Sequence, residues 1–185
     1  MNMVIRTEDL LDTAAGVLVR RPDATLQAIA QAAGVSRTTI FNRFPTRDAL
    51  LEALALDTLE RMRDGMAALD WSPERPLAEV VEDLWRVVRP LSDRAAFLRT
   101  GPLHESPEVT AGWAEAFTPW GVHVATLQAM GRVRDDMPVR WLAGSLIGLL
   151  FAAFDEVDAG EQGAAQAGRL VAASWVAMAG VTPPH

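Results

Sequence analysis

Residues 25–51 read TLQAIAQAAGVSRTTIFNRFPTRDALL, and this stretch contains three signals for the start of a helix. Thr25, Ser36 and Thr46 each precede a run of helix-forming residues, and each hydroxyl oxygen can accept a hydrogen bond from a backbone N–H of the first turn. Gly34 lies between the first two runs, where a glycine lets the chain turn sharply. The stretch therefore predicts two short helices that meet at a tight turn, the helix-turn-helix arrangement, followed by a longer helix.

The second short helix has an apolar face and a polar face. Ile40 and Phe44 are four residues apart, so both are expected to face the core. The opposite side carries arginine, threonine and asparagine side chains, which can bond to phosphates or to base edges, and the sequence leaves these two kinds of contact open. Residues 36–47 contain three arginines and no acidic residue. The candidates for DNA contact are Thr25, Ser36, Arg37, Thr38, Thr39, Phe41, Asn42, Arg43, Thr46 and Arg47.

The same stretch resembles the DNA-binding domain of the tetracycline-repressor (TetR) family of transcriptional regulators, and the resemblance covers residues 6–56. It implies an all-helical homodimer that binds a palindromic operator near a promoter and releases it when a small molecule enters the C-terminal domain. Phe41 stands where the family has tyrosine, so it cannot donate a hydroxyl hydrogen bond to a phosphate. The other departures from the family pattern are Thr38 for glycine, Arg43 for histidine and Arg47 for lysine.

The distribution of charge divides the chain into two parts. Residues 1–50 contain six arginines and five acidic residues, whereas residues 51–185 contain eleven arginines and nineteen acidic residues. The net charge of −7 therefore belongs to the second part and does not exclude nucleic acid as a partner of the first. We predict a helix-turn-helix DNA-binding domain over 1–50 and a helical effector-binding and dimerisation domain over 51–185.

Helical spacing extends over the rest of the chain. Thr7 is expected to cap a first helix that ends near Arg20, and Thr46 to cap a long helix that reaches about Leu69. Prolines divide the later sequence into segments of helical length without strand-like alternation. The fold class is therefore all-α. Further helices are expected near 77–89, 93–100, 107–117, 120–132, 139–157 and 162–179.

Several classes of site and location are excluded by composition. The chain has no cysteine, and its three histidines lack the spacing of metal ligands, so we expect no disulfide, metal or cofactor. The longest uncharged apolar run, residues 141–154, is too short for a membrane span, which needs roughly 20 residues. No secretion signal is expected at the N-terminus, and a cytoplasmic location follows from these features.

The part of the chain beyond residue 50 is rich in aromatic residues, with all six tryptophans. These rings, together with two methionines of the long helix, can line an apolar ligand pocket in which a few polar groups orient the ligand. The alternative is that they fill the core. The candidates for ligand contact are Met62, Met66, Trp85, Phe97, His104, Trp113, Phe117, Trp120, His123, Phe151 and Phe154, with Gln128 as a further polar candidate.

Small residues recur at intervals of four in the last two expected helices. Such stripes let another helix approach closely, and a four-helix dimer interface is predicted from them. The resemblance to the TetR family implies the same interface, and the alternative is packing of the two helices within one chain. The interface candidates are Gly144, Gly148, Ala152, Ala164, Gly168 and Ala172.

Three functions from different classes are compatible with these patterns. The first is a transcriptional regulator, a repressor, that an apolar small molecule releases from DNA. The second is a constitutive or architectural DNA-binding protein whose aromatic residues form a solid core. The third is an enzyme that uses His104 beside Glu105 and Glu108, but the sequence has no nucleophile elbow and no phosphate-binding glycine loop to support it. A plain helical hairpin, without DNA binding, is the alternative to the motif itself.

Overall fold

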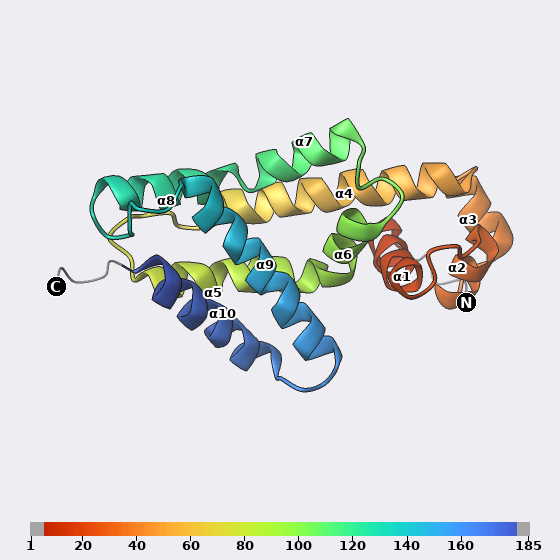
Figure 1. The fold of residues 1–185 in the computed structure, drawn as a ribbon. Coiled ribbons are helices and arrows are strands. Elements are labelled where there is room, and N and C mark those ends of the chain that lie inside the picture. Colours follow the sequence, from red (N-terminus) through yellow and green to blue (C-terminus); the bar gives the residue numbers. More distant parts are fainter. Residues whose placement is uncertain (1–5, 181–185) are drawn as a thin grey trace. The chain divides into compact units, whose positions relative to one another are not determined.

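A computed structural model describes residues 6–180, and all regular secondary structure in this range is helical. The predicted all-α class is therefore confirmed, and Figure 1 shows the order of the helices. None of the helices within 6–180 has the length and apolar character required to cross a bilayer. The elements are α1 (Thr7–Arg20), α2 (Leu26–Ala32), α3 (Arg37–Arg43), α4 (Arg47–Ala67), α5 (Leu77–Val88), the 3-10 turn η1 (Arg89–Leu91), α6 (Ser92–Thr100), α7 (Pro107–Ala116), α8 (Thr118–Ala129), α9 (Val139–Asp158) and α10 (Ala164–Ala179).

The start of α1 differs from the expectation. Arg6, with extended backbone dihedrals, occupies the N-cap position, and Thr7 is the first helical residue. No side chain caps this helix. Its first turn instead carries Glu8 and Asp9, which complement the positive end of the helix dipole. Arg6 donates two hydrogen bonds to Asp9, at 3.1 and 3.2 Å. Its side chain therefore binds a carboxylate of the first turn and does not cap the backbone N–H groups.

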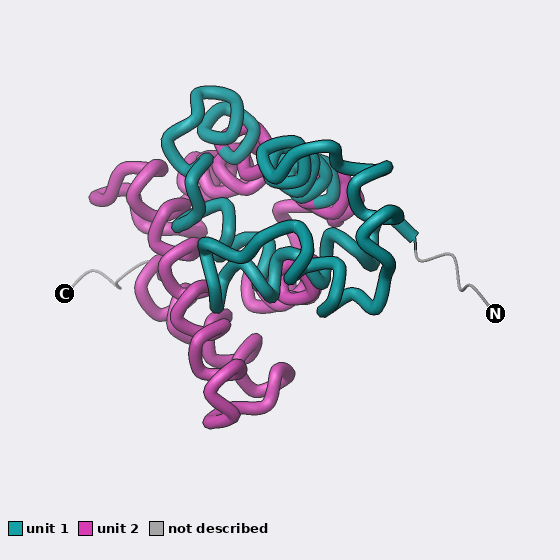
Figure 2. Tube along the Cα trace, turned by 90° about the vertical axis from the view of Figure 1, so that its right-hand side faces the viewer, with its two compact units in different colours: residues 1–61, 93–113 teal, residues 62–92, 114–185 magenta. Residues whose placement is uncertain are grey.

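The chain forms two compact units, and each contains two separate segments of sequence (Figure 2). Unit 1 comprises Met1–Arg61 and Asp93–Trp113, and unit 2 comprises Met62–Ser92 and Ala114–His185. The domain boundary predicted at residue 50 falls within α4, which continues as one helix from unit 1 into unit 2.

Unit 1 has an aliphatic core. Residues from α1, α2, α3 and α4 pack with residues of the second segment, so helices α6 and α7 contribute to the same core as the helix-turn-helix. The hydrophobic effect favours this arrangement because each short helix alone has too little apolar surface to bury. The core side chains with no exposed area include Leu10, Ile29, Ile40, Leu50 and Leu54. The second segment adds Phe97, Leu98 and Val109, which are buried.

Unit 2 has an aromatic interior. Trp120 of α8 and Trp175 of α10 are both completely buried, with ring centroids 4.8 Å apart in an edge-to-face arrangement. The indole N–H of Trp175 donates to the carbonyl of Leu142 in α9. Trp85 of α5 stacks on Phe154 of α9 with centroids 5.4 Å apart. These rings connect α5, α8, α9 and α10 into one packed body.

Candidate DNA-binding surface

The three predicted caps form as expected. The hydroxyl oxygen of Thr25 accepts from the N–H of Ala28 at 3.2 Å, that of Ser36 from Thr39 at 3.0 Å, and that of Thr46 from Ala49 at 3.1 Å. Accepting one hydrogen bond leaves a hydroxyl group able to donate its own proton. The hydroxyls of Ser36 and Thr39 also bond to each other at 2.8 Å. The caps thus fix where α2, α3 and α4 begin.

Gly34 makes the turn between α2 and α3. Its φ of +66° lies in the left-handed region, where a side chain would be strained, although the space around it is open. The N–H of Val35 donates to the carbonyl of Ala30 at 3.0 Å, which closes the end of α2. The glycine is therefore required for its backbone conformation and not for close packing.

Helix α3 presents one face to the core of unit 1 and one to the exterior. Ile40 is completely buried and Phe44 is 6% exposed, as the spacing predicts. Arg37, Thr38 and Asn42 are exposed, whereas Thr39, Phe41 and Arg43 are half-buried. The guanidinium carbon of Arg37 lies 5.2 Å from the ring centre of Phe41, one helical turn later. A cation is thus held over an aromatic ring on the exposed side of a short helix.

Arg47, a candidate for DNA contact, makes contacts within unit 1. Its guanidinium donates to the carbonyl of Ala24 at 3.2 Å and to the carbonyl of Pro22. The side chain therefore ties the first turn of α4 to the loop between α1 and α2. Its charge remains near the start of α4, where the exposed Thr46 lies.

The predicted ligand residues do not form one set. Phe97, His104 and Trp113 belong to unit 1, and the others belong to unit 2. Met62, Met66, Trp85, Phe97, Trp120, His123, Phe151 and Phe154 are all buried, and Phe117 and Trp113 are half-buried. Such burial is expected under the alternative interpretation, in which these residues fill the core and do not line a ligand pocket.

The polar candidates have different surroundings. His104 is exposed, with Nδ1 at 3.0 Å from the carbonyl of Gly101. The Gln128 amide donates to the carbonyls of Arg134 and Met137, which fixes the loop before α9. His123 is 4% exposed, and its Nδ1 lies 3.1 Å from the carbonyl of Trp71.

Three buried polar atoms in unit 2 have no hydrogen-bond partner among the described residues: Nε of Arg89, the indole N–H of Trp120 and Nε2 of His123. Burial lowers the pKa of His123, and the carbonyl of Trp71 opposes this shift only in part. The neutral imidazole is therefore favoured. Trp71, which the sequence reasoning did not select, lies beside both rings, with centroids 6.2 Å from Trp120 and 5.5 Å from His123.

An open groove of unit 2 combines an aromatic ring with charged groups. It has a volume of about 360 Å³ and lies between α5 and the first turns of α10. Trp85 lines it, and its indole N–H donates to the carbonyl of Ala164 at 2.9 Å. The charged side chains of the groove are Glu82, Arg86, Arg89 and Arg169.

The two small-residue stripes have different surroundings. Gly144, Gly148 and Ala152 of α9 are exposed, and so is Ala164 of α10. By contrast, Gly168 and Ala172 are buried within unit 2. A Cβ added to Gly168 would lie 2.4 Å from Trp85 Cδ1, so the absence of a side chain there accommodates α5 of the same chain.

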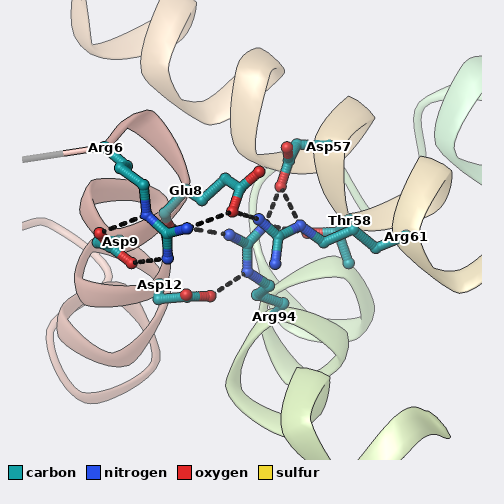
Figure 3. Close-up of polar contacts among 8 residues, drawn as sticks. All are labelled: Arg6, Glu8, Asp9, Asp12, Asp57, Thr58, Arg61 and Arg94. Atoms are coloured by element: carbon teal, nitrogen blue, oxygen red, sulfur yellow. Dashed lines mark hydrogen bonds and ion pairs between the residues drawn. The ribbon is translucent and has the colours of Figure 1, made fainter.

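Sequence reasoning also missed Arg94, which is 1% exposed in unit 1 and bonds to carboxylates of α1 and α4 (Figure 3). A charged residue is rarely buried without a partner. The available signal was its position in α6 directly before Ala95 and four residues before Leu98, both of which are buried.

The sequence is similar to a known protein family and to one characterised repressor. A family model described as bacterial regulatory proteins, tetR family, matches residues 10–54, which include α2 and α3. The HTH-type transcriptional repressor Rv1474c of Mycobacterium tuberculosis is 32% identical over 120 residues. This match covers 62% of the chain and 61% of the relative, so the chain spans about three-fifths of that protein.

Solved structures share the fold over most of the chain. The TetR-like regulator LfrR of Mycobacterium smegmatis, in complex with proflavine, has a TM-score of 0.72 at 21% identity, covering 91% of this chain and 93% of that one. A TetR family regulator from Shewanella sp. PV-4 has a TM-score of 0.67 at 23% identity, covering 96% and 100%. Residues 10–54, which hold the helix-turn-helix, are therefore similar to the tetR family of bacterial regulatory proteins, and the rest of the chain shares the fold of solved TetR-like regulators.

Proposed function

We propose that the chain is a transcriptional regulator that binds operator DNA through α3. The observation that supports this most directly is the exposed face of α3, where Arg37, Thr38 and Asn42 lie together within a stretch that has no acidic residue. Guanidinium groups bond to phosphate or guanine, and asparagine amides pair with adenine. A rigid seven-residue helix with caps at its start can present these groups to a major groove.

A homodimer would match this function, because two-fold symmetry presents two copies of α3 to a palindromic site. The exposed stripe of α9 supports pairing with a second copy. Beside it, a groove of about 200 Å³ between α9 and α10 is lined by apolar residues that include Leu149, Ala152 and Leu170. Leu170 is 50% exposed, and together with the apolar residues of this groove it forms an exposed apolar surface of the kind that marks interfaces.

An effector would act by binding one conformation of the regulator more tightly than the other. The groove beside Trp85 supports an aromatic effector, since this tryptophan and three arginine side chains line it. Coupling between effector and DNA is typically about 1–3 kcal/mol, which is a 5- to 150-fold change in operator affinity. Proflavine, present in the LfrR structure, is the first compound to test.

A constitutive DNA-binding protein is the second candidate. The observation that favours it is the tight burial of Trp120, Trp175 and His123, which leaves these rings inaccessible to a ligand in this conformation. A titration of the DNA-bound regulator with proflavine separates the two candidates. Release of DNA supports effector control, and Trp85→Phe should weaken it, whereas Trp141→Phe, at an exposed tryptophan of α9, should not.

The experiment that tests DNA binding selects operator sequences from a random duplex library and measures affinity at several salt concentrations. The logarithm of the binding constant should fall linearly with the logarithm of the salt concentration, with a slope of about −0.9 for each phosphate contacted. Arg37→Ala and Asn42→Ala should each lower specific affinity by about 1–3 kcal/mol if they read bases. Arg63→Ala, on an exposed position of α4, is the matched control. Affinity that is independent of salt, or equal for all variants, contradicts the proposal.

A further inference from the structure

Arg94 is a charged residue in the interior of unit 1, and its guanidinium has acceptors on two other helices. Nε donates to Asp12 of α1 and Nη1 to Asp57 of α4, both at 2.6 Å. Nη2 donates to the backbone carbonyl of Glu8 at 3.3 Å, and the hydroxyl of Thr58 lies 3.4 Å from Nη1. Figure 3 shows the guanidinium between the carboxylates of α1 and α4.

Further ion pairs surround the Arg94 contact, and their arginine side chains are more exposed the farther they lie from Arg94 in the network. Arg61 pairs with Asp57 at 2.9 Å and with Glu8 at 3.4 Å, and its side chain is 31% exposed. Arg6 pairs with Asp9 at 3.1 Å, and its side chain is 72% exposed. Exposed pairs contribute little to stability. The Arg94 side chain, only 2% exposed, is therefore the member of the network whose geometry matters most.

A buried guanidinium constrains geometry more strongly than it stabilises a fold. Its desolvation offsets much of the attraction to its partners, so replacing a whole buried ion cluster by neutral groups is often neutral for stability. Its planar fork, however, holds each acceptor in a fixed direction. Because Arg94 bonds to Asp12 and Asp57 at the same time, it sets the separation of α1 and α4 as well as the position of α6.

The position of α3 depends on these helices. Within unit 1, α1 packs on α2 and α2 packs on α3. Only residues 44–46 separate α3 from α4. A change in the separation of α1 and α4 therefore reaches α3 from both of its neighbours in the chain. Arg94 is also the second residue after the chain passes from unit 2 into unit 1.

We propose that Arg94 is a positioning residue for DNA binding, which acts on α3 through α1 and α4 without contacting DNA. This inference rests on the proposed DNA-binding function. Its consequence is that α6, far from the helix-turn-helix in sequence, determines whether unit 1 holds α3 in the orientation that fits a groove. A movement of α6 would act on DNA affinity through this side chain.

The test separates position from stability with two variants. Arg94→Met leaves Asp12 and Asp57 without their buried cation, and the melting temperature should fall by about 10 °C. The triple variant Arg94→Met/Asp12→Asn/Asp57→Asn removes the buried cation together with the two carboxylates that it bonds to, and should recover most of that loss. Its operator affinity should nevertheless remain at least about tenfold below that of the unmodified protein. The ratio of specific to non-specific DNA affinity should fall as well, which a loss of stability alone does not produce.

The matched control is Arg6→Met/Asp9→Asn, which removes the exposed pair of the same network and should leave both quantities unchanged. Equal operator affinity for the triple variant and the unmodified protein would overturn the positioning role. Failure of the unmodified protein to bind any duplex would instead overturn the proposed function. If Arg94→Met does not fold, Arg94→Lys provides a second test. This variant keeps the buried positive charge but lacks the planar guanidinium fork. It should bind operator more weakly than the unmodified protein at the same salt concentration.

Discussion

Helices α3 and α10 both carry a clear sequence pattern, and the structure uses the two patterns differently. In α3, Ile40 faces the core while Arg37 and Asn42 are exposed, as expected. In α10, Gly168 packs against Trp85 of its own chain. An arginine or asparagine faces outward because burying it is costly, so the spacing of such residues predicts which side of the helix faces solvent. A glycine accepts any close neighbour, and only long-range packing decides which helix that is.

The largest effect is expected at Trp175, the completely buried tryptophan by which α10 packs into unit 2. Trp175→Ala should lower the free energy of unfolding by about 3–5 kcal/mol, because a completely buried indole and its bond to Leu142 are lost. Urea denaturation followed by circular dichroism measures the change. Ser174→Ala, at the exposed neighbouring position, should stay within about 0.5 kcal/mol. Equal effects of the two changes would show that α10 is not anchored through this face.

A second pair of variants compares the two small-residue stripes directly. Gly168→Ala should destabilise unit 2 by about 1–3 kcal/mol, because the new methyl group would overlap the Trp85 ring. Gly144→Ala meets no atom within 4 Å in this chain. Alanine is a better helix former than glycine by about 1 kcal/mol, so the exposed site should gain stability. Thermal denaturation of both variants, at a protein concentration low enough to keep the chain monomeric, gives the comparison, and destabilisation of the monomer by Gly144→Ala would contradict it.

The extent to which sequence predicted the structure follows the same contrast. The caps at Thr25, Ser36 and Thr46 are local interactions over three residues, and all three form. Gly34 adopts the positive φ that the turn requires. These features need no knowledge of distant residues. The family resemblance, carried by the same stretch, was confirmed for that reason.

Long-range features were not predictable from local patterns. The position of Gly168 depends on Trp85, far away in sequence, and the burial of Arg94 depends on carboxylates of α1 and α4. Arginine usually faces solvent, so the position of Arg94 beside apolar residues of α6 was too weak a signal to place it inside. The predicted DNA contacts, ligand contacts and dimer contacts stay predictions, and Arg47 shows that a cation near the motif can also hold a loop.

A further test follows from the pKa of His123, which lies in the aromatic cluster that anchors α10. Burial lowers this pKa in the folded protein below its ordinary value of 6.5. The unfolded chain therefore binds a proton first as the pH falls, and stability decreases below about pH 6.5 until the folded state is protonated as well. Urea denaturation between pH 7.5 and 5 measures the slope. His123→Gln should remove part of it, and an unchanged slope would show that other groups cause the pH dependence.

The smallest expected effect concerns Arg37 and Phe41 on α3. Phe41 is half-buried, and a guanidinium at an exposed position over such a ring gains about 0.5–1 kcal/mol, which is enough to favour one orientation of Arg37. Phe41→Leu keeps an apolar residue against the core but removes the ring, so operator affinity should fall about two- to fivefold.

A double-mutant cycle isolates this contribution, since Phe41 also packs against the core of unit 1. Phe41→Leu should cost affinity when Arg37 is present and almost none in an Arg37→Met background, measured at a temperature where all variants are folded. The same cycle with Thr38→Ala in place of Arg37→Met should show no coupling, because Thr38 is exposed on α3 but has no charge to place over the ring. Equal losses in both backgrounds would mean that Phe41 supports α3 only through the core. Coupling confined to Arg37 would show that an outward-facing side chain of α3 is oriented before DNA arrives, whereas the small residues of α9 and α10 are defined only by the surface they meet.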